Sequence, residues 1–97
     1  MIELSERTVD KLNAIFSDKH RDEVEELLKV ACSENISFCK NHNKYDMKRI
    51  RFSVLKLSEG SIEKLVEAIE PAQTDWRDLF MAAGFGHDAE AHNKWNP

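Results

Sequence analysis

Three side chains of the types that bind zinc lie close together in the first half of the chain. Cys32 and Cys39 are separated by six residues, and His42 follows after two more. Structural zinc sites usually contain closer pairs, of the CxxC or HxxxH kind, and no fourth ligand is obvious here. We therefore interpret both cysteines as packed, reduced thiols, and we predict neither a metal site nor a cofactor.

The remaining histidines are the next candidates for chemistry. His87 and His92 are five residues apart, whereas two groups on one helix face would be three or four apart. Asp88 and His92 do have the i, i+4 spacing, but in a polar segment. His20 shares a helix side with apolar residues, which favours a half-buried structural role. Neither a glycine-rich phosphate loop nor a local nucleophile signature is present, so we predict no catalytic residues and no enzymatic activity.

A basic segment at residues 44–56 raises the question of nucleic-acid binding. The net charge of the chain is -4, and the segments before and after this one are both acidic. In a helix-turn-helix, the helix that follows the basic segment would enter the major groove. That helix presents Glu63, Glu67 and Glu70, which phosphates would repel. We expect the basic helix to neutralise its acidic neighbours, and nucleic-acid association through this helix remains the alternative function.

The segment TDWRDLF, residues 74–80, places one of only two tryptophans among charged residues at the start of a predicted helix. Thr74 or Asp75 would cap that helix, and acids in its first turn suit the helix dipole. Trp76 heads an apolar stripe that continues three and four residues later. We predict that Trp76 is a structural clamp, inserted between the third and fourth helices, and that this segment is not a catalytic site.

Five segments with apolar residues at helical spacing must position these side chains. Few glycines and prolines argue against an all-β fold, which needs many tight turns. We predict an all-α single domain of about five helices in stacked antiparallel hairpins. The helical domain spans residues 1–86, and a polar C-terminal tail spans residues 87–97. A short helical turn is expected within residues 33–45.

The third predicted helix, residues 46–58, is apolar over more than half of its circumference, which predicts a central position. Arg51 projects from within this apolar arc, so it must snorkel or find an acid; we expect a partly buried structural residue paired with an acid from another helix, for which the fourth and fifth helices provide candidates. Gly60 would end this helix in a left-handed conformation. The fourth helix is expected to bury Val66 among its apolar residues and to be limited or kinked by Pro71.

Several short motifs lie between residues 47 and 85. They are RIRF at 49–52, LKLS at 55–58 followed by Gly60, Ala68-Ile69, DWRDL at 75–79 and AGF at 83–85. This pattern resembles a group of small all-helical bacterial proteins without a known function. The resemblance implies stacked helix hairpins, broadly similar to armadillo-type repeats. It implies no activity, ligand or catalytic residue.

Together these observations favour a protein–protein interaction or adaptor module, because a stack of helix hairpins offers faces and grooves but no chemistry of its own. Aromatic residues near Arg or Lys are typical of binding hot spots. The candidate interaction surface consists of Phe38, Tyr45, Arg49 and Lys56. The alternative is that the two aromatic side chains seal the core beneath the loop at residues 36–45.

The cellular context is predicted from the hydropathy of the chain. The first ten residues, MIELSERTVD, are acidic and lack the apolar region of a signal peptide. No apolar run approaches the 18 residues typical of a membrane span. We therefore expect a cytoplasmic protein that does not associate with membranes. Its partner is expected to be an unidentified protein rather than nucleic acid, and the chain itself to be a monomer or a weak homodimer.

Overall fold

The fold is all-helical. A computed structural model describes residues 3–32, 44–87 and 91–97, and for residues 44–46 it describes the backbone alone. These residues form α1 (Glu6–Ile15), α2 (Asp18–Ala31), α3 (Lys44–Ser58), α4 (Ile62–Thr74), α5 (Trp76–Ala83) and α6 (Ala91–Lys94), and the described ranges contain no strand. The prediction of an all-α single domain is confirmed. The sixth helix, a single turn, lies in the segment expected to be a polar tail.

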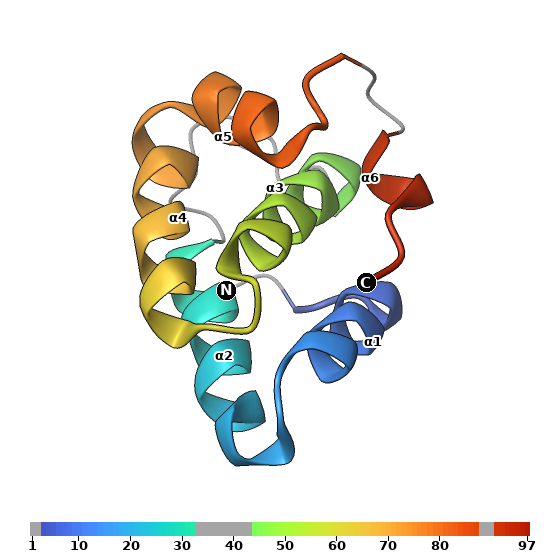
Figure 1. The fold of residues 1–97 in the computed structure, drawn as a ribbon, viewed down its shortest axis with the longest axis vertical. Coiled ribbons are helices and arrows are strands. Elements are labelled where there is room, and N and C mark those ends of the chain that lie inside the picture. Colours follow the sequence, from blue (N-terminus) through green and yellow to red (C-terminus); the bar gives the residue numbers. More distant parts are fainter. Residues whose placement is uncertain (1–2, 33–43, 88–90) are drawn as a thin grey trace.

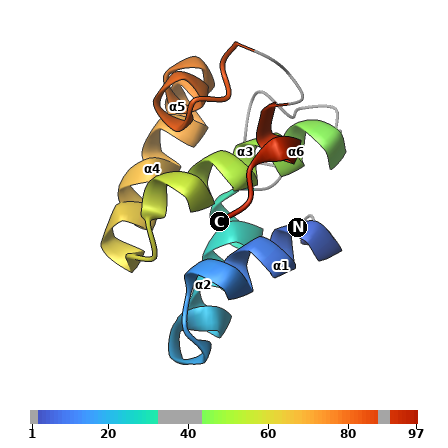
Figure 2. The same ribbon diagram turned by 45° about the vertical axis from the view of Figure 1, so that its right-hand side comes forward.

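Helix α3 occupies the centre of the molecule, as its wide apolar arc predicted (Figure 1). It contacts α1, α4, α5 and α6, while α2 packs against α1 and α4. Figure 2 shows α6 lying over α3, on the side where α1 also approaches. A helix with four neighbours has almost no side that faces solvent, and most of the described side chains of α3 are therefore buried.

Side-chain caps start three of the helices, and Asp75 is one of the two residues that the sequence offered for the third of them. The hydroxyl of Ser5 accepts a hydrogen bond from the backbone N–H three residues later at 3.2 Å, and Ser61 does the same at 3.4 Å. The carboxylate of Asp75 accepts from the third residue beyond it, also at 3.4 Å. Each cap satisfies one of the amides that a helix start leaves without an intrahelical partner.

The connection between α3 and α4 is tight because Gly60 adopts a left-handed conformation, with φ +83°. The backbone N–H of Ser61 donates to the carbonyl oxygen of Ser58 at 2.8 Å. A Cβ atom at position 60 would lie 3.2 Å from the carbonyl oxygen of Ile15 at the end of α1. Glycine is therefore favoured twice, by its φ angle and by the close approach of α1.

Helix α4 continues past Pro71, which we expected to limit or kink it. The helix ends at Thr74, three residues beyond the proline. The backbone N–H of Asp75 donates to the carbonyl oxygen of Pro71 at 2.7 Å, so the helical pattern is restored directly after the ring. A proline removes only its own N–H bond, and near a helix end few later bonds depend on it.

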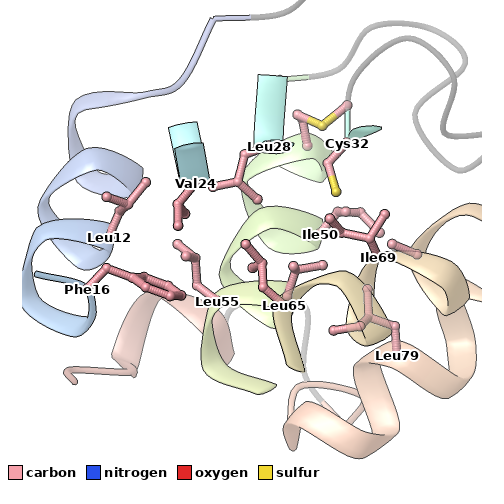
Figure 3. Packing of buried hydrophobic residues seen from close by; sticks show 14 of the residues in the cluster. Leu12, Phe16, Val24, Leu28, Cys32, Ile50, Leu55, Leu65, Ile69 and Leu79 are labelled. Carbon is pink, nitrogen blue, oxygen red and sulfur yellow. The ribbon is translucent and has the colours of Figure 1, made fainter. Parts of the chain in front are cut away.

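The main core lies between α3 and the helices α1, α2, α4 and α5 (Figure 3). Figure 3 labels ten of its buried residues: Leu12, Phe16, Val24, Leu28, Cys32, Ile50, Leu55, Leu65, Ile69 and Leu79. Each of the first five helices contributes at least one side chain to this cluster. The 3- and 4-residue apolar spacing read from the sequence therefore corresponds to one shared core.

A second, smaller apolar cluster connects α3 to the C-terminal residues. It contains Phe52, Ala83 and Phe85, with Trp95 half-buried against them. Gly84, at φ +79°, lets the chain leave α5, and the backbone N–H of Phe85 donates to the carbonyl oxygen of Phe80 at 2.8 Å. The Phe85 side chain belongs to this second cluster, where its ring also contacts those of His92 and Trp95, whereas Phe80 belongs to the main core.

The C-terminal residues differ from the solvated segment that the sequence suggested. His92 in α6 is fully buried, and its ring lies 5.5 Å from that of Phe52. The indole of Trp95 lies 6.1 Å from the same phenyl ring, in an edge-to-face arrangement. The residues from α6 to Trp95 thus cover α3, so this segment contributes apolar contacts that its polar composition concealed.

Candidate functional site

The interaction surface predicted from the sequence is only partly covered by the structure. Phe38 and the side chain of Tyr45 lie outside the described residues. Arg49 and Lys56 are described, and both reach toward Phe85. Arg49 Nη2 donates to the carbonyl oxygen of Phe85 at 2.8 Å, and Lys56 Nζ lies 4.8 Å from the centroid of the Phe85 ring. The structure thus brings these two cations together around the end of α5.

The guanidinium of Arg49 also lies 4.0 Å from the centroid of the Phe80 ring. A cation held over an aromatic face and bonded to a carbonyl fastens two helices together. Arg49 and Lys56 therefore have structural roles between α3 and the residues that follow α5. Their use as a binding surface would compete with these contacts.

Arg51 is buried, with 2% of its surface exposed. Arg51 Nε donates to the carbonyl oxygen of Cys32 at 3.0 Å, and Nη1 donates to that of Glu3 at 2.8 Å. We expected a carboxylate of the fourth or fifth helix as its partner, but the side chain points to the opposite side, between the start of α1 and the end of α2. There it donates to the carbonyl oxygen of the residue that caps the end of α2 and to one in the segment that precedes α1.

Trp76 is half-buried at the first position of α5, beside the main core. Its ring lies 5.9 Å from that of Phe80, and the guanidinium of Arg77 lies 5.1 Å from its centroid. Its partial exposure differs from the full insertion that we expected. Leu79, Phe80 and Ala83 are the buried residues of this helix.

The candidates for metal binding stay apart or undescribed. Cys39 and His42 lie outside the described residues, and Cys32 is a buried free thiol within the main core. In the described part of the chain, no group of three or more His, Cys, Asp or Glu side chains has a geometry that could hold a metal ion. The same part contains no helix long and apolar enough to cross a membrane.

A further candidate surface is the seam between α2 and α4, two helices that lie side by side in Figure 1. Gln73 marks the side of α4 that faces α2, because its side-chain amide donates to the carbonyl oxygen of Ala31 at 3.0 Å. Val66 precedes Gln73 by seven residues, two turns along the same side of the helix. Val66 therefore borders the seam.

Apolar side chains border this seam from both helices and remain open to solvent. Val30 is 58% exposed and Val66 is 50% exposed. An open depression of about 240 Å³ lies on the α2 side, between Leu27, Val30 and Ala31. Of the three large apolar residues that the described chain exposes, two thus border one seam, and Met81 on α5 is the third.

The rim of the seam is acidic. Glu23 and Glu26 line the depression on α2 together with its apolar residues. On α4, Glu63 and Glu70 lie three residues before and four residues after Val66, so they flank it on the exposed face. Both walls of the seam therefore combine an apolar stripe with carboxylates.

The nearby lysines form ion pairs with acids outside this rim, and Lys29 also lines a second depression together with Glu26 and Val30. Lys29 Nζ lies 3.5 Å from a carboxylate oxygen of Glu3, which precedes α1, and Lys64 Nζ lies 3.3 Å from one of Glu59, in the turn before α4. Exposed ion pairs of this kind contribute little to stability. They do show that the ammonium groups of Lys29 and Lys64 pair with Glu3 and Glu59 rather than with the carboxylates of the rim.

Sequence reasoning missed this surface because it assigned Val66 to the buried face of the fourth helix. Val66 lies next to the buried residues Leu65 and Ile69 on the helix, yet it is exposed. The apolar stripe of α4 is therefore wider than the surface that the neighbouring helices cover. An apolar arc wider than the available contact was the signal that could have revealed it.

Comparison of the chain with protein-family models, with curated proteins and with solved structures finds no significant match.

Proposed function

We propose that the chain is a cytoplasmic protein-binding module without catalysis, and that its docking surface is the α2–α4 seam. The observation that carries the proposal is the pairing of Val30 and Val66 along one seam, each at least half exposed. Scattered single apolar residues are normal on protein surfaces, whereas apolar residues gathered along one groove with a polar rim are typical of interaction sites.

The seam is a better surface for this role than the one predicted from the sequence. Arg49 and Lys56 already contact Phe80 and Phe85 within the chain, and a partner would have to replace those contacts. The valines of the seam have solvent as their neighbour, so covering them with a partner removes apolar surface from water without an internal loss.

Nucleic-acid association is the less favoured function because the described arginine and lysine side chains of α3 make contacts within the chain. Arg51 is buried, Arg49 bonds to a backbone carbonyl, and Lys48 Nζ lies 6.0 Å from the centroid of the Phe52 ring. A phosphate backbone needs several accessible positive charges on one face.

Affinity capture with matched surface variants tests the proposal. The bait is the tagged protein in a lysate of its native cells, compared with Val30→Glu/Val66→Glu and with Met81→Glu. Met81 is 72% exposed on a different helix, so its variant controls for a new surface charge. We expect a protein partner that the wild type and Met81→Glu recover equally and that the seam variant recovers at least about tenfold less, equivalent to about 1.4 kcal/mol.

A partner recovered equally by the seam variant would show that the docking surface lies elsewhere. Recovery of nucleic acid in place of protein would support the alternative function. Because Val30 and Val66 are exposed, both variants should remain folded, and a thermal melt of each confirms this before capture.

A further inference from the structure

We infer that the partner segment for the α2–α4 seam is a basic amphipathic helix; this inference rests on the proposed function. An apolar stripe between two helices is the surface onto which a partner helix lays its own apolar face. The charge of the rim then selects among partner helices, because like charges facing each other across an interface are costly.

Carboxylates border the seam on both α2 and α4. Glu23 and Glu26 border the depression beside Val30, and Glu63 and Glu70 flank Val66. All four residues are exposed. A helix lying along the seam would pass between these two rows of carboxylates. Lysine or arginine on both flanks of its apolar face would therefore meet an acid on each side.

The cations of α2 and α4 do not neutralise these rows. Lys29 and Lys64 form their ion pairs with acids outside the seam. Lys19 and Arg21 lie in the first turn of α2, about three turns before Val30, and Arg21 Nη1 lies 3.5 Å from a carboxylate oxygen of Asp18. The carboxylates of the seam thus remain available to a basic partner.

The molecule itself contains a short C-terminal helix, α6, that is held by cations of the helix beneath it. α6 lies across α1 and α3, where the side chain of Arg7 donates to Asn93 and Lys11 Nζ lies 5.7 Å from the Trp95 ring. Cations of the underlying helix hold that segment in place. Along the α2–α4 seam the underlying helices carry carboxylates, so the complementary helix must carry the cations.

Designed peptides of about 18 residues, long enough for about five helical turns, provide the probe. The first has leucines along one face and lysines elsewhere, the second has glutamates in place of the lysines, and the third has the first composition in an order without an apolar face. Binding to the intact protein is measured by fluorescence anisotropy of labelled peptide at about 50 mM and about 150 mM salt.

We expect the leucine–lysine peptide to bind the wild-type protein and the other two to bind at least about tenfold more weakly. The seam variant Glu26→Lys/Glu70→Lys should weaken this binding about tenfold or more. The control Glu6→Lys/Asp10→Lys makes the same change of net charge on exposed positions of α1, and it should weaken binding less than about threefold.

Three results would overturn the inference. The first is a glutamate peptide that binds as tightly as the lysine peptide, and the second is an α1 control that loses as much affinity as the seam variant. The third is a dimer of the protein that Val66→Glu dissociates, because a second copy would then be the occupant of the seam. A captured partner that depends on Val30 and Val66, with no binding of the lysine peptide, would overturn the charge class alone and leave the proposed function standing.

Discussion

Two sides of this small domain differ in how completely their apolar side chains are covered. On the α1–α3 side, the aromatic ring of Phe52 would face solvent if the chain ended at Phe85, and α6 covers it with His92 and Trp95. On the α2–α4 side, Val30 and Val66 stay at least half exposed. The described chain therefore closes one apolar surface with its own C-terminal turn and leaves another open.

The charges differ between the two sides in the same way. Arg7 and Lys11 on α1 hold α6, through hydrogen bonds to Asn93 and through contact with the ring of Trp95. Glutamates border the open seam. This difference is the basis of the proposed docking surface, since exposed apolar residues with a charged rim add little to folding but can add to binding.

Phe52→Ala should have the largest effect on the closed side. Its phenyl ring is fully buried between α3 and α6, and its removal should lower the free energy of unfolding by about 3–5 kcal/mol. Urea denaturation of the variant beside the wild type measures the change. A loss below about 1 kcal/mol would mean that the closed side is as tolerant of change as the open one.

Trp95→Ala should have an intermediate effect. The indole is half-buried and makes ring contacts with Phe52 and Phe85, each worth about 0.5–1.5 kcal/mol, so we expect a loss of about 2 kcal/mol. Hydrogen exchange should show weaker protection in α6 and unchanged protection in α2. Equal loss of protection in both helices would remove the distinction between the two sides.

Replacement of Lys11 should have a smaller effect on stability, and this effect should depend on pH. The pKa of Lys11 lies below its ordinary value of 10.5, mainly because burial removes water from its ammonium group, with a further contribution from Arg7 and an opposing one from Asp10. A lysine with a lowered folded-state pKa binds fewer protons than in the unfolded chain. The free energy of unfolding therefore rises as the pH increases from the lowered pKa toward 10.5.

Lys11→Met should remove this rise, so the difference in stability between the variant and the wild type should change between pH 7 and pH 10. Chemical denaturation at both pH values measures it. Lys64→Met is the control, because Lys64 is exposed and lies in the first turn of α4, away from α6. A parallel pH dependence in Lys11→Met and the wild type would contradict the assigned environment.

Val30→Ser and Val66→Ser should have the smallest effect on stability, within about 0.5 kcal/mol for each substitution. Both side chains are at least half exposed, so little packing is lost. A denaturant midpoint that falls as far as that of Trp95→Ala would mean that the seam belongs to the core, and it would count against the proposed docking surface.

Much of the fold was determined by the sequence alone, because it depends on local spacing. Apolar residues three and four positions apart predicted five helices, and the caps at Ser5, Ser61 and Asp75 were read from residue types that bond to nearby backbone amides. Gly60 was identified because a left-handed residue after a helix is most easily a glycine. The central position of α3 followed from the width of its apolar arc.

Only the tertiary structure decided which apolar surface is covered and which charge meets which partner. His92 is buried and Trp95 is half-buried against Phe52, which lies 40 or more positions earlier in the chain, and Arg51 bonds to carbonyl oxygens on two other segments. Val66 has the residue type and spacing of a core position, yet α2 packs beside it rather than over it. Helical periodicity shows which face is apolar, but how much of that face is covered depends on where the neighbouring helices lie.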